Sequence, residues 1–162
     1  MHRWRPPTTK EDFRPRLKRV VIPWIGTPYR AGHQMPGVGT DCVRFVCGVL
    51  DAMCKRPPVS FETLPFDASL HNREGAVASM LAIRQRFRPN SMVPTDFLEP
   101  GDIVLSGPSG VAHALLVGWE PNEFWHASHM AGGVVRSGLS YFKDHPIGYV
   151  IRSDDREGWA HD

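Results

Sequence analysis

The sequence predicts an α+β fold in which N-terminal helices pack on a C-terminal antiparallel sheet of about five strands. Two observations predict it. In the first half of the 162-residue chain, apolar residues recur at helical spacing. After Gly101, short runs of β-branched and aromatic residues alternate with turn sequences. The length fits a single domain covering residues 1–162, in which we expect residues 1–10 and 153–162 to be flexible tails.

Three helices are expected, in this order. The first covers about residues 11–25, and a loop rich in glycine and proline then continues through Gly39. The second begins at Cys42 and ends near Lys55, because the prolines at 57 and 58 cannot continue a helix. A third amphipathic helix is expected from about residue 73 to residue 87.

The second half of the chain predicts strands that follow one another through short turns. A turn at residues 120–122 joins two of them into an antiparallel hairpin, which makes His113 and His126 near neighbours. Both faces of the strand around His113 carry apolar residues, so we expect that strand to be buried on both sides. The expected strands are Asp102–Ser106, Val111–Trp119, Glu123–Ser128, Gly133–Ser137 and Gly148–Arg152.

Cys42 is the strongest candidate for a reactive residue. It follows a glycine-rich turn, and Thr40 and Asp41 before it are good helix N-caps. A thiol in the first turn of a helix lies at the positive end of the helix dipole. We therefore expect the dipole to lower the pKa of Cys42 and to favour the thiolate, which is the nucleophilic form.

The histidines provide candidates for a base. A cysteine nucleophile needs a base within hydrogen-bond reach, and that base needs a third group to orient it. His113 and His126 fit these two roles, although a single histidine in a buried strand is more often a hydrogen-bonded core residue. His33 could line the cleft, and His129 either points away from His126 or lies in the turn before Gly132. The remaining histidines are interpreted as surface residues: His2, His71, His145 and His161.

Composition excludes several other classes of function. Cys47 and Cys54 share the helix of Cys42 and are expected to pack in the core without forming disulfides. The cysteines and histidines lack the paired spacing of a metal site, so no metal is expected. A net charge of +2 does not indicate nucleic-acid binding, and the arginines between residues 3 and 19 form either a solvated end or a contact for an acidic partner. No transmembrane segment or signal peptide is expected.

Four segments, taken in order, resemble the motifs of the NlpC-type cell-wall cysteine peptidases, a papain-like superfamily. The first resembles the family's W-x-G-T-P-Y segment, and the second its D-C-S-G-F-V nucleophile motif. The third resembles P-G-D-L-V, and the last, in two pieces, the H-V-G-I-Y-x-G and M-I-H-A-S strands. The loop before Cys42 resembles the subset found with phage tails and gene transfer agents. The matching residues are 24–29, 41–46, 100–104, and 113–118 with 124–128.

The resemblance implies a peptidase that hydrolyses an amide bond in the peptide stem of peptidoglycan without a cofactor. It implies Cys42 as nucleophile, His113 as general base and acid, and His126 as the residue that orients His113. Tail proteins of a phage-like particle are then possible partners, and the protein would be carried by that particle or be cytoplasmic before assembly. Two alternatives stay open: an amidase or acyltransferase on the same fold, and a catalytically silent tail assembly protein.

The resemblance also implies residues for substrate binding, and the sequence departs from the family there. Tyr29 matches a tyrosine that shapes the substrate site. His33, in the loop before Cys42, and Asp41, directly before Cys42, are further candidates for substrate binding. Val43 and Arg44 stand where the family has Ser-Gly, so specificity for a D-glutamyl bond is not expected to carry over unchanged. Arg44 either meets a substrate carboxylate or is a surface arginine without a role.

Overall fold

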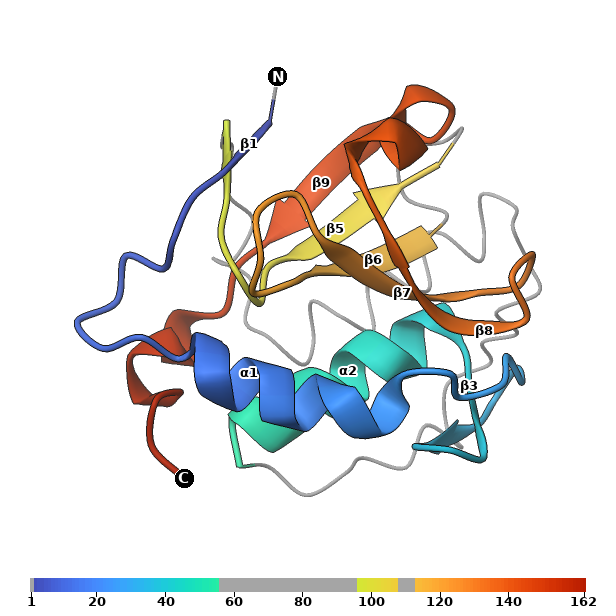
Figure 1. The fold of residues 1–162 in the computed structure, drawn as a ribbon, viewed down its shortest axis with the longest axis horizontal. Helices are drawn as coiled ribbons and strands as arrows, with labels where there is room; N and C mark the ends of the chain where they lie inside the picture. Colours follow the sequence, from blue (N-terminus) through green and yellow to red (C-terminus); the bar gives the residue numbers. More distant parts are fainter. Residues whose placement is uncertain (1, 56–95, 108–112) are drawn as a thin grey trace.

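The protein is described here by a computed structural model that covers residues 2–55, 96–107 and 113–162 (Figure 1). Its helices are α1 (Arg14–Val21), the short 3-10 helix η1 (Ile22–Trp24) and α2 (Cys42–Met53). All strands of the main sheet are antiparallel, in the order β8-β7-β6-β5-β9. They are β5 (Ile103–Ser106), β6 (His113–Val117), β7 (Phe124–Ser128), β8 (Gly133–Ser137) and β9 (Ile147–Ile151). The predicted α+β class with a five-stranded antiparallel sheet is confirmed.

Smaller elements surround this sheet. Strand β1 (Arg3–Trp4) pairs in parallel with β4 (Phe97–Leu98), and β2 (Gln34–Met35) pairs with β3 (Gly39–Thr40). Two further 3-10 helices are η4 (Leu139–Lys143) and η5 (Asp154–Gly158). The helix predicted over residues 73–87 lies outside the described residues.

The first helix is shorter than predicted because of its two prolines. Pro15 occupies the first turn of α1, where its missing N–H removes no helical hydrogen bond. Pro23 cannot donate the hydrogen bond that would continue the α-helix, and the chain tightens into η1 at that point. Residues 11–13 and 25 consequently lie outside the helices.

Helices α1 and α2 cover one face of the sheet (Figure 1). Alternate residues of each strand point to opposite faces, and the core consequently forms two clusters. Ala114 and Leu116 of β6 join the cluster between the sheet and the helices. Leu115 and Val117 join a second cluster on the other face, which also contains Phe124. The prediction that this strand is buried on both sides is confirmed, since all its residues after His113 are buried.

The loop after α1 is fastened to the start of β8. Gly26 N donates to Val134 O at 3.0 Å, Val134 N donates to Thr27 O at 2.9 Å, and Tyr29 N donates to Gly132 O at 2.9 Å. A Cβ atom added at Gly133 would lie 2.6 Å from Thr27 O, so a side chain at that position would push the loop away from the strand. This close approach fixes the loop that carries Tyr29 beside the sheet.

Both ends of the chain pack against the domain, in contrast to the flexible tails expected at residues 1–10 and 153–162. Near the N-terminus, Arg5 Nε donates to the buried Glu99 carboxylate at 2.7 Å. Near the C-terminus, Trp159 is 1% exposed, and its ring centroid lies 5.1 Å from that of Phe13. The polar composition of both ends concealed these single anchoring residues. Within residues 2–55, 96–107 and 113–162, no helix is long and apolar enough to cross a membrane.

Candidate active site

Helix α2 begins after a buried aspartate that joins the preceding loop to the first turn of the helix. Asp41 is fully buried and accepts a hydrogen bond from Arg44 N through Oδ1 at 2.9 Å, which caps the helix. Its Oδ2 accepts from Gly32 N at 2.9 Å and from Arg44 Nη1 at 2.6 Å. Arg44 is 5% exposed, so its interpretation as a surface arginine is wrong. The geometry gives Asp41 and Arg44 a structural role, and substrate contact by either residue stays a prediction.

Cys42 is the first residue of α2, and its side chain is almost completely enclosed. It is 3% exposed, and burial raises the pKa of its thiol to about 12. The backbone N–H groups of Ala114, Val43 and Cys42 itself lower this pKa, and the charge of Asp41 raises it. The expected net lowering is therefore wrong for this enclosed thiol, because desolvation outweighs the helix-start N–H groups.

His113 and His126 are brought together as the hairpin predicted. His113 Nε2 and His126 Nδ1 are 2.7 Å apart and share a hydrogen bond. On its other side, His126 Nε2 shares a hydrogen bond of 2.8 Å with Ser137 Oγ of the neighbouring strand β8. Three polar side chains therefore form a continuous chain across β6, β7 and β8.

Burial keeps His126 neutral. It is 2% exposed, and burial, followed by the positive charge that His145 can carry, lowers its pKa to about 4. A neutral imidazole has a single N–H, so it donates one of these two hydrogen bonds and accepts the other. His126 therefore couples the proton arrangement of His113 to the donor or acceptor role of Ser137.

Cys42 lies near the start of β6, the strand that carries His113. The backbone N–H of Ala114, the residue after His113, hydrogen-bonds Cys42. Burial and then the charge of Cys42 raise the pKa of Tyr141 in η4 to about 12, and the Tyr141 ring centroid lies 6.2 Å from that of His113 and 5.1 Å from that of His126. Tyr141 therefore borders both the thiol and the imidazoles.

Around Cys42, His113 and His126 lie three residues that were not singled out as site residues from the sequence: Ser137, Tyr141 and His145. We call these six residues the thiol–imidazole cluster. His145, interpreted as a surface residue, is instead half-buried and stacks on Tyr141 with ring centroids 4.4 Å apart. Its spacing of four residues from Tyr141 was the available signal. The signal for Ser137 was its place at the end of a predicted strand that follows the His126 strand through a short turn.

The other predicted site residues lie in the loop before α2 and the turn after β7. The Tyr29 ring centroid lies 5.2 Å from that of His129, which occupies the turn before Gly132 as one of the two predicted placements had it. His33 is exposed, and its Nδ1 lies 3.2 Å from Ala31 O. Cys47 is buried in the core as predicted, and Cys54 packs against the same cluster.

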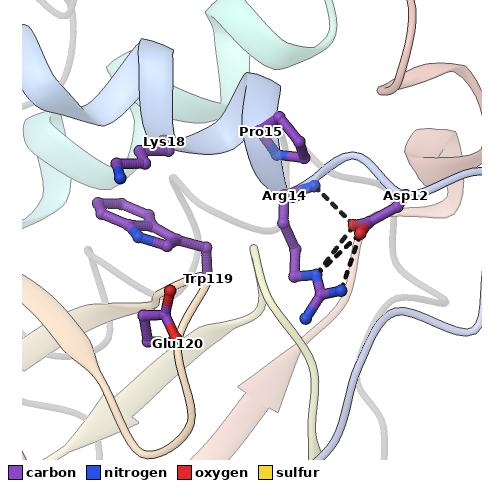
Figure 2. Close-up of a pocket in the computed structure, with 6 residues that line it drawn as sticks. All are labelled: Asp12, Arg14, Pro15, Lys18, Trp119 and Glu120. Carbon is purple, nitrogen blue, oxygen red and sulfur yellow. Dashed lines mark hydrogen bonds and ion pairs between the residues drawn. The ribbon is translucent and has the colours of Figure 1, made fainter.

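A separate cavity of about 420 Å³ lies between the start of α1 and the loop after β6 (Figure 2). Charged side chains surround the indole of Trp119 in its lining. Two of them, Asp12 and Arg14, are joined by hydrogen bonds of 2.8 to 3.1 Å. Trp119 stacks on Trp125 with ring centroids 5.6 Å apart. The cavity includes none of the thiol–imidazole cluster. Its lining residues are Asp12, Arg14, Pro15, Lys18, Trp119 and Glu120.

Among the described residues, no three His, Cys, Asp or Glu side chains are grouped so that they could hold a metal ion. A thiol beside a hydrogen-bonded imidazole chain has the groups needed for nucleophilic attack on an acyl carbon. The sequence matches no family model, and no curated protein matches it.

Proposed function

We propose that the protein is a papain-like cysteine peptidase that hydrolyses an amide bond in the peptide stem of bacterial peptidoglycan. One observation supports the proposal: the backbone N–H of Ala114 lowers the pKa of a cysteine at a helix start, and the adjacent His113 shares a 2.7 Å hydrogen bond with His126. This arrangement supports the proposed reaction class. The choice of peptidoglycan comes from the motifs that resemble the NlpC-type peptidases.

In the proposed reaction, His113 moves the proton that the neutral thiol must lose. Because His113 Nε2 is engaged by His126, Nδ1 takes the proton while Sγ of Cys42 attacks the carbonyl carbon. The S–C bond forms, and the carbonyl electron pair moves to oxygen, where the backbone N–H of Cys42 is placed to stabilise it. The C–N bond then breaks, and His113 gives its proton to the leaving amine.

Water completes the cycle. His113 Nδ1 removes a proton from the water that attacks the thioester, the S–C bond breaks, and the proton returns to sulfur. The products are a free amine and a free carboxylic acid, and the enzyme regains its neutral thiol. Delivery to the cell wall by a tail-like particle, with tail proteins as partners, belongs to the same proposal.

The enclosure of Cys42 favours a second candidate, a tail assembly protein without catalytic activity. Because Cys42 is only 3% exposed, its sulfur has no room for a substrate carbonyl unless neighbouring side chains move. A silent protein would leave this thiol enclosed permanently, whereas a peptidase must open it when substrate binds. The two candidates therefore differ in whether Cys42 reacts at all.

Digestion of purified peptidoglycan tests the proposal. The unaltered protein is expected to release muropeptides with a new free amine, identified by mass, and Cys42→Ala is expected to lower the rate by at least ~10³-fold. Cys47→Ala removes a buried sulfur from the same helix and is the matched control, expected to retain activity. Equal digestion by Cys42→Ala would overturn the proposal. Transfer of the acyl group to an added amine, without free acid, would indicate the acyltransferase instead.

A further inference from the structure

We propose that Ser137 is a positioning residue that fixes the proton arrangement of the His126–His113 pair by accepting a hydrogen bond from His126. The inference rests on the proposed use of His113 as the base. Ser137 ends β8 and lies opposite Phe124 of β7, so its side chain leaves the sheet on the same face as that of His126. Its hydroxyl oxygen lies 2.8 Å from His126 Nε2.

Only one proton arrangement lets His113 act as a base through Nδ1. In it, His113 Nε2–H donates to His126 Nδ1, which must then carry a lone pair. His126 is buried and neutral, so its proton lies on Nε2 and is donated to Ser137 Oγ. Nδ1 of His113 then carries the lone pair that receives the thiol proton.

The reversed arrangement blocks this transfer. If the Ser137 hydroxyl donated to His126 Nε2, the His126 proton would lie on Nδ1 and be donated to His113 Nε2. His113 Nδ1 would then already carry a proton and could not take another. Once His113 becomes an imidazolium, both of its nitrogens donate, and a proton on His126 Nδ1 would face another donor at 2.7 Å. An acceptor at position 137 therefore stabilises the charged intermediate specifically.

The surroundings of the pair are mostly aromatic. In the part of the chain that the structure describes, Tyr141 of η4 and His145, which follows η4, are titratable groups that border it, and the charge of Cys42 of α2 acts on Tyr141. Tyr141 and His145 stack on each other, and the pKa of Tyr141 is raised to about 12, so its hydroxyl stays neutral. Among the described residues, the hydrogen bond recorded for His126 Nε2 is the one to Ser137 Oγ.

The test compares Ser137→Ala, Ser137→Thr and the matched control Ser128→Ala across pH. Ser128 also ends a strand of the sheet, and its hydroxyl accepts a hydrogen bond from Ala131 N at 3.1 Å. Two rates are measured: muropeptide release, and alkylation of Cys42 by iodoacetamide, followed by mass spectrometry. Alkylation needs the same proton transfer to His113 but no peptidoglycan.

Ser137→Ala is expected to lower both rates on their plateau by about fivefold to tenfold, the typical effect of one lost hydrogen bond. Because the imidazolium loses its supporting acceptor, the acid limb of both profiles is expected to move to lower pH by roughly half a unit. Ser137→Thr keeps the hydroxyl and is expected to recover most of the lost rate. Ser128→Ala is expected to lower the free energy of unfolding but to leave the acid limb of both pH profiles where it is in the unaltered protein.

The outcomes separate the two proposals. If the unaltered protein does not cut peptidoglycan but Ser137→Ala slows alkylation and displaces its limb, the proposed function fails and the role of Ser137 stands. Unchanged profiles in Ser137→Ala overturn that role. Nitrogen NMR of the unaltered protein gives a check that needs no variant: both imidazoles are expected to be protonated on Nε2, and a proton on His126 Nδ1 overturns the inference.

Discussion

At the scale of single residues, burial acts on the thiol and on the imidazole behind the proposed base in opposite directions. It raises the pKa of Cys42 to about 12 and lowers that of His126 to about 4. Both groups are therefore neutral at neutral pH. The proposed reaction starts from a neutral thiol, and charge separates only when the proton moves to His113.

The depressed pKa of His126 predicts a pH-dependent stability. Its folded-state pKa of about 4 lies below the ordinary value of 6.5, so the unfolded chain binds more protons between these values. The contribution of neutral His126 is complete above pH 6.5 and falls by on the order of 3 kcal/mol as pH decreases to 4. Urea unfolding between pH 4 and 7 measures it.

His126→Gln is the comparison for this measurement, because glutamine keeps polar atoms at the site and does not titrate. We expect its free energy of unfolding to depend less steeply on pH than that of the unaltered protein. Identical pH dependence in the two proteins would show that His126 is not the group responsible.

The sequence predicted that His113 and His126 are neighbours, but it did not predict which side chains surround them. Counting back from the turn at residues 120–122 was sufficient to place His113 near His126, because a short hairpin fixes its register. Burial of Cys42 was not predictable, since Cys42 belongs to a core cluster whose other members, such as Leu116 and Ala127, are distant in the sequence. The N–H groups at the helix start do lower the pKa of Cys42, as expected, but burial raises it by more.

At the scale of elements, the position of the start of α2 depends on the Asp41 carboxylate as well as on the hydrogen bonds of the helix itself. Asp41 caps the helix through Arg44 N and also binds the Arg44 guanidinium and Gly32 N. The position of Cys42 therefore depends on a buried ion pair one residue before it. The sequence predicted the cap but contained no sign that the Arg44 guanidinium turns back onto Asp41.

Asp41→Ala is expected to lower the free energy of unfolding by about 3–5 kcal/mol, because it removes the cap and leaves the Arg44 guanidinium buried without this carboxylate. Asp41→Asn is the matched control. It retains an oxygen that can cap the helix and is expected to cost less. Urea unfolding monitored by circular dichroism measures both. Equal stability of Asp41→Ala and the unaltered protein would contradict this account of the helix start.

At the scale of the whole molecule, one buried carboxylate connects segments from both ends of the chain. Glu99 accepts from Arg5 Nε at 2.7 Å and forms an ion pair with Arg156 of η5. Nearby, Trp159 packs over Gly101, where an added Cβ would lie 2.5 Å from the indole and where φ is +82°. The two ends therefore close the domain beside the start of β5.

Trp159→Ala is expected to destabilise the fold by about 3–5 kcal/mol, because it opens a cavity against Phe13 and Gly101. Trp159→Phe keeps an aromatic ring and is expected to lose less. Thermal unfolding and limited proteolysis of the last ten residues measure the effect. If Trp159→Ala unfolds at the temperature of the unaltered protein, these residues are not an integral part of the domain.

The overall architecture was more predictable than the ends of the chain. The shift from helical spacing to β-branched runs at Gly101 extends over many residues, so its signal survives local exceptions. The terminal segments depend on Trp159 and on the partners of Glu99. A single anchoring residue in a polar segment leaves no periodic pattern, which is why both ends were expected to be loose.

The enclosure of Cys42 also bears on how long the sulfur survives outside a reducing environment. Peroxides oxidise thiolates through the sulfenic acid, and both charge and access set the rate. The neutral sulfur of a residue that is only 3% exposed is a poor target for such oxidants. In the proposed peptidase, the packing that must part for a substrate would therefore also protect Cys42 before use, so oxidative damage at Cys42 is expected to follow opening of the site.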